Sequence, residues 1–170
     1  MAVYTKINKK EISYINKKFK KNKIINFKGI KQGIENTNYL LKSRNKKFIL
    51  TIFEKRVVKK DIPFFMKLMD QLNNSKINCP RPIKNKNGNY LIKIKNKPAC
   101  IVSFLEGKDK KILNLKNCFE TGKIIAQMHQ ASKNYKLSRK NSMGVKNLNP
   151  LFNSIKFKSK KFINIEKFLK

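Results

Sequence analysis

Three short apolar stretches separated by turn-forming residues constrain the fold of this chain most strongly. The stretches are residues 23–27, 38–42 and 48–53. Gly29 and Gly33 lie between the first two, and glycine accepts the positive φ angles that tight turns require. Only Thr51 is polar in the third stretch, which is typical of a strand covered on both faces. We therefore expect three consecutive β-strands, with a glycine turn between the first two.

Apolar residues at helical spacing predict four helices. The expected helices cover residues 11–20, 61–72, 115–132 and 162–169. Asp61 is expected to cap the second helix, whose first turn tolerates a proline. The predicted buried face of that helix consists of Phe65, Leu68, Met69 and Leu72. The predicted stripe of the third helix consists of Leu115, Phe119, Gly122, Ala126 and His129. His129 is therefore interpreted as a packing residue rather than a general base.

A second turn signal and a further apolar stretch lie in the middle of the chain. Residues 85–89 contain a glycine between asparagines and predict a hairpin between Ile83 and residues 90–92. Residues 99–105 form another apolar stretch that ends in a polar stop. We expect this stretch to be a further strand of the same sheet.

The pattern changes after Gly107. Residues 1–107 predict a sheet with accompanying helices, whereas residues 108–170 predict the beginning of a helical region. Residues 134–150 have the composition of a loop. The chain is therefore expected to divide into two parts at this glycine.

The net charge of +33 is the most extreme property of the composition, with 42 Lys and Arg against nine Asp and Glu. Such a field attracts nucleic acids and anionic membranes. However, the lysines are spread through nearly every predicted element, and Arg, which binds phosphate and base edges better, is scarce. Hydrophobic residues make up 40% of the chain, which is enough for a core. We interpret the charge mainly as a solvated surface, with a nucleic-acid-binding module as the alternative.

The sequence also bears on location and redox state. No apolar run approaches the length that crosses a bilayer, and the first residues lack the apolar segment of a signal peptide. Cys79, Cys100 and Cys118 are widely spaced and form no zinc pattern with His129. We expect buried, reduced thiols in a cytoplasmic protein that has no membrane partner.

The order and local sequence of these pieces resemble one family. Matching stretches include Gly33-Ile-Glu-Asn-Thr-Asn-Tyr39, Phe48-Ile-Leu-Thr-Ile-Phe-Glu-Lys-Arg56 and Ile101-Val-Ser-Phe-Leu-Glu-Gly107. The others are residues 1–5, 27–30, 63–69, 79–82, 98–99, 126–131 and 150–152. Over essentially the whole chain, these blocks resemble the homoserine kinases that are related to aminoglycoside and choline phosphotransferases.

The resemblance implies an α+β fold. A protein-kinase-like N-terminal lobe, with an antiparallel sheet and a helix, would be followed by the first helices of an incomplete C-terminal lobe. ATP would lie between the lobes with Mg²⁺, and its γ-phosphoryl group would pass to the hydroxyl of L-homoserine in threonine biosynthesis. The implied partners are these small molecules, without a specific nucleic acid. Another small-alcohol kinase, for choline or an aminoglycoside, is the close alternative.

The resemblance also implies which residues hold the nucleotide. The expected nucleotide-binding residues are Gly29, Ile30, Lys31, Gly33, Thr51, Val102, Ser103, Phe104 and Leu105. The two glycines are spaced too loosely to form a phosphate-binding motif by themselves, and an ordinary hairpin turn is the alternative. Residues 102–105 belong to the expected link between lobes, whose backbone groups would contact adenine. An ordinary core strand is the alternative there.

One expected charge is absent from the third strand. Kinases place a phosphate-pairing lysine on this strand, and Thr51 occupies the most similar position. Lys55 follows about 13 Å further along an extended chain, which makes it a poor substitute. Asp70 is the carboxylate within the helix at residues 61–72, but it falls off the apolar stripe. We therefore expect Asp70 to be a solvated surface residue.

The resemblance does not include the catalytic residues of the family. The family's His-x-Asp-x-x-x-x-Asn stretch does not occur in this sequence, because His129 is followed by Gln and Ala. Consequently, no residue is assigned as a catalytic base or as a metal ligand. We interpret the chain as the N-terminal part of a longer enzyme, which would leave Phe119 and Ile125 exposed.

Overall fold

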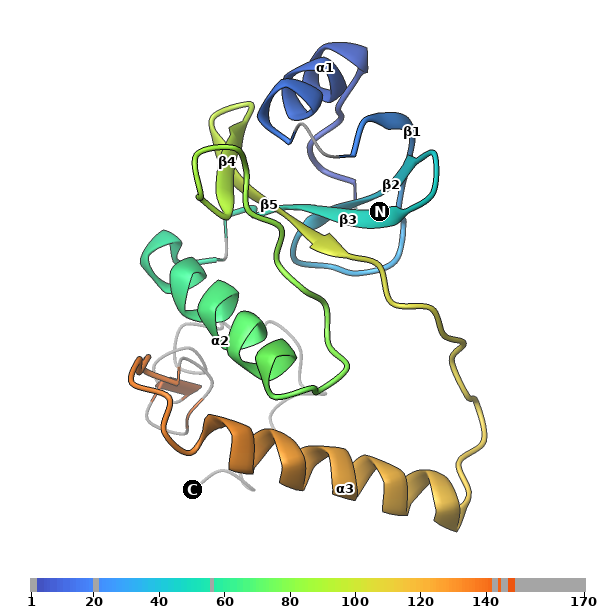
Figure 1. The fold of residues 1–170 in the computed structure, drawn as a ribbon, viewed down its shortest axis with the longest axis vertical. Helices are drawn as coiled ribbons and strands as arrows, with labels where there is room; N and C mark the ends of the chain where they lie inside the picture. Colours follow the sequence, from blue (N-terminus) through green and yellow to red (C-terminus); the bar gives the residue numbers. More distant parts are fainter. Residues whose placement is uncertain (1–2, 20–21, 56, 142–143, 145–146, 149–170) are drawn as a thin grey trace, which may run out of the picture. The chain divides into compact units, whose positions relative to one another are not determined.

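A computed structural model describes residues 3–19, 22–55, 57–141, 144, 147 and 148 of this chain. Residues 1–137 form one compact unit and residues 138–170 form another. The helices and strands named below all lie in the first unit (Figure 1). The predicted helix at residues 162–169 lies outside the described residues. Within the described residues, no helix combines the length and the apolar character needed to cross a bilayer.

A five-stranded antiparallel sheet forms the centre of the first unit. Its strands are β1 (Ile24–Gly29), β2 (Thr37–Ser43), β3 (Lys47–Ile52), β4 (Leu91–Ile94) and β5 (Lys97–Ser103). The strand order is β1-β2-β3-β5-β4. The first three strands pair consecutively, as the short apolar stretches and the glycine turn predict. The pairing of β3 with β5 brings together segments that the chain separates by an entire helix.

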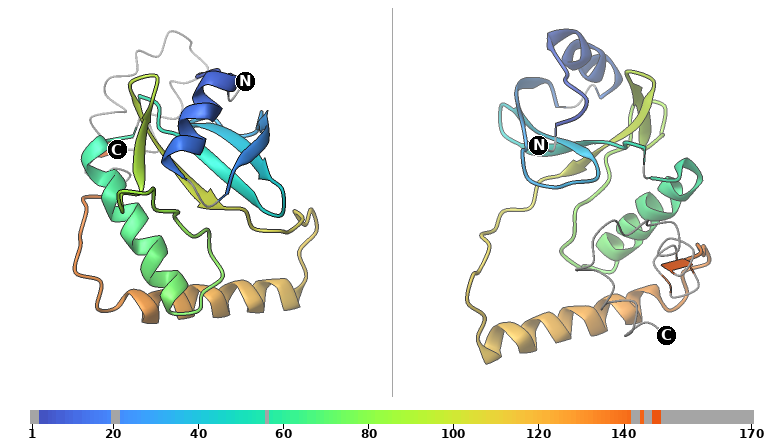
Figure 2. Two further views of the ribbon diagram at one scale, coloured as in Figure 1. Left: turned by 45° about the horizontal axis from the view of Figure 1, so that its top comes forward. Right: turned by 180° about the vertical axis from the view of Figure 1, so that it is seen from behind.

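Helices cover both faces of this sheet (Figure 2). α1 (Lys9–Lys18) covers one face, and α2 (Ile62–Asn74), which follows a 3₁₀ turn η1 (Lys59–Asp61), covers the other. A third helix, α3 (Leu115–Ser132), follows the sheet in sequence. Asn8 begins α1 with a capping box, since its side chain accepts from Lys10 N–H while Glu11 accepts from Asn8 N–H. Asp61 makes no capping hydrogen bond with its side chain, because η1 holds its backbone in a helical conformation before α2 begins. The predicted cap is therefore wrong.

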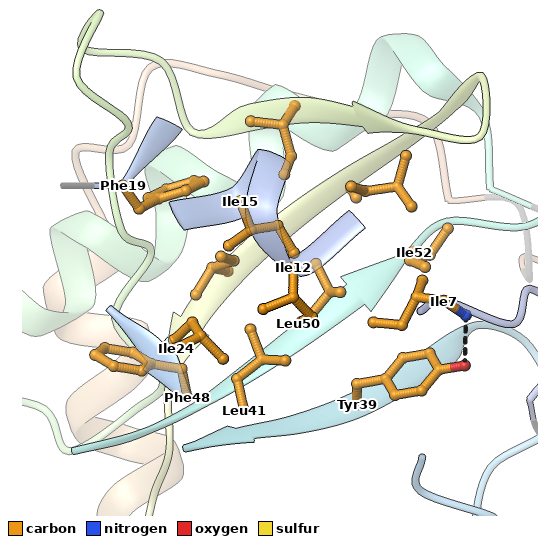
Figure 3. Packing of buried hydrophobic residues seen from close by; sticks show 14 residues of the cluster. Ile7, Ile12, Ile15, Phe19, Ile24, Tyr39, Leu41, Phe48, Leu50 and Ile52 are labelled. Carbon is orange, nitrogen blue, oxygen red and sulfur yellow. Dashed lines mark hydrogen bonds between the residues drawn. The ribbon is translucent and has the colours of Figure 1, made fainter. Parts of the chain in front are cut away.

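The larger core cluster lies between α1 and the sheet (Figure 3). Ile12 and Ile15 of α1 point toward Leu41 and Leu50 of the strands. Of these, Ile15, Leu41 and Leu50 are fully buried. Alternate residues of a strand point to the same face, so the buried residues of β2 follow one another at every second position. The helical spacing predicted for residues 11–20 is confirmed by this packing.

A smaller cluster lies between α2 and the other face of the sheet. Ile62 and Met66 of α2 pack against Cys100 and Val102 of β5. The predicted face of α2 is only partly correct, because Leu72 is buried, whereas the side chains of Phe65, Leu68 and Met69 are half-buried. The buried face is rotated toward Ile62 and Met66, which meet β5 directly. The predicted burial of β3 on both faces is only partly correct, because Phe48, Leu50 and Ile52 are buried on the α1 side, whereas Ile49 and Thr51 on the other side are half-buried.

The predicted hairpin around residues 85–89 is wrong in its pairing. The turn itself forms, with Asn85 N–H donating to Asn89 C=O at 2.8 Å. However, Ile83 N–H donates to Ile101 C=O of β5, not to the segment at residues 90–92. β4 instead pairs with β5 through a two-residue turn at Lys95 and Asn96. This turn contains no glycine that could have indicated it in the sequence.

The tight turn between β4 and β5 offers a route to higher stability. Lys95 and Asn96 have φ angles of 48° and 63°, and hairpin turns of this kind favour Asn-Gly. We expect the double substitution K95N/N96G to raise the free energy of unfolding by about 1 kcal/mol, because both residues then tolerate positive φ. Urea denaturation measures this change. Lys95→Val should act in the opposite direction, and a stabilising effect of valine would contradict the assigned turn.

The helix α3 has the predicted bounds but not the predicted burial. None of its residues is buried in the described structure, and Phe119 is 69% exposed. His129 and Cys118 are exposed as well. The expectation of a packed histidine is therefore wrong, and of the three thiols expected to be buried, Cys100 is buried, Cys79 is half-buried and Cys118 is exposed. By contrast, the predicted exposure of Phe119 and Ile125 is confirmed.

The C-terminal end of α3 is attached to α2 by a few specific contacts. Gln71 donates from Nε2 to Ala131 C=O at 2.7 Å. Tyr135 donates its hydroxyl hydrogen to Phe64 C=O at 2.7 Å, and their rings meet edge to face with centroids 5.3 Å apart. The remaining length of α3 presents its apolar side chains to solvent.

Candidate functional site

Two rows of side chains run across the sheet on the face that α2 partly covers. Residues that pair directly across antiparallel strands share a face. The first row consists of Lys28, Leu40, Ile49 and Val102. The second row consists of Asn38, Thr51, Cys100 and Leu91. Both rows lie on the face of α2, because Cys100 and Val102 pack in its cluster.

α2 covers the β5 end of these rows and leaves the β1–β3 end accessible. Lys28 is exposed, whereas Leu40, Ile49, Asn38 and Thr51 are half-buried. Leu40 and Ile49 therefore form an apolar surface, with a polar pair directly beside it. A flat apolar group could pack on this surface while a polar group meets the pair.

The polar pair occupies the position at which a lysine was expected. Thr51 donates its hydroxyl hydrogen to Asn38 Oδ1 at 2.8 Å, so the Asn38 amide hydrogens face away from this contact. Lys55 is exposed beyond the end of β3. At the Thr51 position of β3, a neutral hydrogen-bonded pair thus stands where a kinase would place its phosphate-pairing lysine.

Asp70 of α2 contacts Tyr90 and Arg81. The hydroxyl of Tyr90 donates to Asp70 Oδ2 at 2.8 Å, and Arg81 Nε lies 4.0 Å from Oδ1. Burial, together with the hydrogen bond to this carboxylate, raises the pKa of Tyr90. The expectation of a solvated Asp70 is wrong, since its side chain is only 28% exposed. Asp70 ties α2 to the segment that precedes β4.

The loop at residues 30–36 connects β1 with β2. Gly33 has a φ angle of +101°, so the prediction that it needs glycine's freedom is confirmed. Gly29 lies within β1 and has no positive φ, which corrects the prediction for that residue. It is constrained instead by space, because an added Cβ would lie 3.0 Å from Val3 Cγ2. Ile30 N–H donates to Asn38 C=O at 2.9 Å, and Lys31 is exposed in the loop.

The predicted link between lobes begins inside β5 and continues beyond it. Ser103 N–H donates to Arg81 C=O at 2.9 Å, and Phe104 N–H donates to Lys47 C=O at 3.3 Å. These two donors are therefore engaged within the protein. Within the described residues, Leu105 N–H has no such partner, and Leu105 is 38% exposed. Of the backbone N–H groups of Ser103, Phe104 and Leu105, only that of Leu105 is left to donate to a ligand in the described structure.

A salt bridge fixes the start of this link. Lys47 Nζ lies 2.7 Å from Glu106 Oε1 and 5.2 Å from the centroid of the Phe104 ring. Both side chains of the pair are partly exposed, so its contribution to stability is small. Its effect is to keep residues 104–106 close to the first residue of β3.

The structure brings some of the predicted residues together and adds others. Thr51 and Val102 share one face of the sheet, and the loop with Lys31 and Gly33 connects two of its strands. The sequence-based list missed Leu40, Ile49 and Asn38. Alternation along β2 and β3 could have revealed them, because they lie between residues that face α1. Among the described residues, no three His, Cys, Asp or Glu side chains come close enough together to hold a metal ion.

The family to which this architecture belongs follows from comparison with known proteins. Residues 26–150 match the model of the phosphotransferase enzyme family. The chain therefore belongs to the phosphotransferase enzyme family. It is 39% identical over 154 residues to a homoserine kinase of Parvibaculum lavamentivorans, covering 91% of this chain and 48% of that protein. It is 38% identical over 154 residues to a homoserine kinase of Bradyrhizobium diazoefficiens, with 91% and 47% covered. The chain thus spans about half the length of these curated relatives.

Solved structures show the same fold at low sequence identity. A spectinomycin phosphotransferase in complex with ADP and spectinomycin aligns with a TM-score of 0.65 and 15% identity, covering 92% of this chain and 50% of that chain. The AMP-bound complex of the same enzyme aligns with a TM-score of 0.56 over 94% of this chain and 52% of that chain. The expected α+β fold, an antiparallel sheet with helices as in the N-terminal lobe of these kinases, is confirmed.

Proposed function

We propose that this chain is the nucleotide-binding part of a cytoplasmic homoserine kinase. The observation that carries the proposal is the match of 91% of the chain to proteins named homoserine kinase at 38–39% identity. The accessible sheet face supports it, since Leu40 and Ile49 offer an apolar surface next to polar donors. The nucleotide-bound complexes of the structurally similar phosphotransferase are consistent with ATP as the ligand. The boundary between the two lobes is proposed to follow Gly107.

The adenine ring is proposed to pack on Leu40 and Ile49, with Leu105 N–H as its backbone donor. Asn38 and Thr51 face the ribose or the phosphates, and the loop with Lys31 and Gly33 lies over the phosphates. Exposed backbone N–H groups and glycine suit phosphate oxygens, because the chain can approach them closely. In this proposal the nucleotide is bound and oriented without a lysine at the Thr51 position of β3.

Mg²⁺ does not fit the described part of this site. The two rows on the sheet contain no carboxylate, and Asp70 is turned toward Tyr90. Because Mg²⁺ requires oxygen ligands that are usually carboxylates, we derive no step through the metal from these residues. The base that accepts the hydroxyl proton of homoserine is likewise not assigned to this chain.

This chain should therefore bind the nucleotide without catalysing phosphoryl transfer to homoserine. A fluorescent ATP analogue is expected to bind, whereas ADP release should be the same with and without L-homoserine, because proton transfer to a positioned base is missing. Titration and a coupled ADP assay measure the two properties. Homoserine-dependent turnover would contradict the missing chemistry.

The charge of +33 calls for a control on this binding. Unlabelled adenosine carries no phosphate, so it should displace the analogue from an adenine site but not from a diffuse cationic surface. Moderate salt should remove only the diffuse component. If inorganic triphosphate competes and adenosine does not, the proposed nucleotide site is wrong.

A further inference from the structure

The segment at residues 3–7 lies along the loop that connects β1 with β2. The hydroxyl of Tyr4 donates to Ile34 C=O at 2.9 Å, and Tyr4 N–H donates to Thr37 Oγ1 at 3.0 Å. Val3 contacts the position of Gly29 at the other end of the loop. A segment that precedes the sheet in sequence thus reaches both ends of this loop.

A buried carboxylate joins this segment to the sheet. Glu54 Oε1 accepts hydrogen bonds from the hydroxyls of Thr5 and Thr37, each at 2.7 Å. Lys97 of β5 pairs with the other carboxylate oxygen, and the Glu54 side chain is only 9% exposed. The backbone N–H of Glu54 donates to Asn36 Oδ1 at 3.3 Å. One side chain therefore connects the segment, the end of the loop and the start of β5.

Tyr39 adds a second buried connection beside the first. Its hydroxyl accepts from Ile7 N–H at 3.1 Å, as Figure 3 shows, and donates to Thr5 C=O at 3.1 Å. Tyr39 is 5% exposed and lies on the α1 side of the sheet. These contacts are on the face opposite Leu40 and Ile49, so they cannot touch a ligand bound there.

The middle of the loop lacks comparable support. Within the described residues, no hydrogen bond reaches Lys31, Gln32 or Gly33, whereas the contacts above hold residues 34–37. The conformation of the loop is therefore determined at its ends. A ligand that binds under the loop benefits from ends that are already ordered, because less conformational entropy is lost on binding.

We infer that residues 3–7, held by Glu54, form a brace that orders the loop at residues 30–36 and so raises nucleotide affinity. Tyr4 and Glu54 are positioning residues in this inference, since they act through the loop. The inference rests on the proposed nucleotide site. Residues 3–7 thus have a role in ligand binding that does not require contact with the ligand.

Tyr4→Phe tests the brace with little risk to folding, because Tyr4 is 56% exposed. Loss of the hydrogen bond to Ile34 should weaken binding of a fluorescent ATP analogue by about threefold to tenfold. Amide hydrogen exchange at residues 34–36 should become faster, with the unfolding midpoint unchanged. Tyr14→Phe is the matched control, since Tyr14 lies on α1 and loses the same hydroxyl away from the loop; its affinity and exchange should stay at wild-type values.

The outcomes separate this inference from the proposed function. If the wild-type chain binds no nucleotide, the proposed function fails, and the exchange rates at residues 34–36 still decide whether the brace exists. If the wild-type chain binds and Tyr4→Phe binds equally well, the inference is wrong and the proposed function stands. Equal loss of affinity in Tyr4→Phe and Tyr14→Phe would also overturn it.

Discussion

Replacing Leu41 with alanine should lower the free energy of unfolding by about 3 kcal/mol, whereas the same change at Leu40 should cost less than about 1 kcal/mol. Leu41 is fully buried between α1 and the sheet. Leu40 is its neighbour on the opposite face and is half-buried. Both substitutions replace leucine with alanine, so a difference in the lost stability shows which face of β2 is buried. Urea denaturation of both variants measures it.

Nucleotide affinity should fall more in Leu40→Ala than in Leu41→Ala, which is the reverse of the order expected for stability. Leu40→Ala removes part of the proposed adenine surface and should weaken binding of the fluorescent ATP analogue by about tenfold, because the adenine ring loses the apolar area that it would cover. Folded Leu41→Ala, measured below its unfolding transition, should bind within about twofold of wild type. If the two variants lose similar amounts of stability and affinity, the assignment of faces on β2 is incorrect.

Local patterns predicted the elements of this fold better than they predicted what covers them. The glycine at position 33 and the short apolar stretches are local signals, and the three strands form as they predict. The bounds of α3 were also predicted, because helical periodicity is local. Its burial was not, since an apolar stripe shows which face a helix would bury when a partner is present. Phe119 and His129 have no such cover in the described structure.

How the site residues are brought together could not be predicted from any short stretch of the sequence, because it depends on the pairing of distant strands. Ile49 and Val102 share a row only because β5 pairs with β3, after α2 and β4 intervene. The family resemblance supplied the order of the elements and drew attention to Thr51, but it did not reveal Asn38 as its hydrogen-bond partner. Glu54 was missed for the same reason, since its partners Thr5 and Lys97 are 49 and 43 residues away in sequence.

Neutralising Glu54 should have the second large effect. Glu54→Gln is expected to lower the free energy of unfolding at pH 7 by about 2 kcal/mol, because it removes charge-assisted hydrogen bonds from a nearly buried group. The loss is smaller than for a fully buried pair, since the Lys97 side chain is 39% exposed and remains partly solvated. Glu120→Gln is the matched control on an exposed helix face and should change stability by less than about 0.5 kcal/mol. In the Lys97→Met background, Glu54→Gln should cost less, which a double-mutant cycle measures.

The difference in the free energy of unfolding between wild type and Glu54→Gln should become smaller as the pH falls. Burial alone would raise the pKa of Glu54, but the hydrogen bonds from Lys97, Thr5 and Thr37 and the charge of Lys97 together hold it below its ordinary value of 4.5. A carboxyl group with a lowered pKa in the folded state stabilises the protein fully above its unfolded pKa and loses this contribution as pH falls through the folded pKa. The stability gap between wild type and Glu54→Gln should therefore be constant from pH 7 to about pH 5 and narrow below about pH 4.5. A gap that widens on acidification would mean that Glu54 is protonated more readily in the folded protein, and the carboxylate would then not be the group that holds the brace.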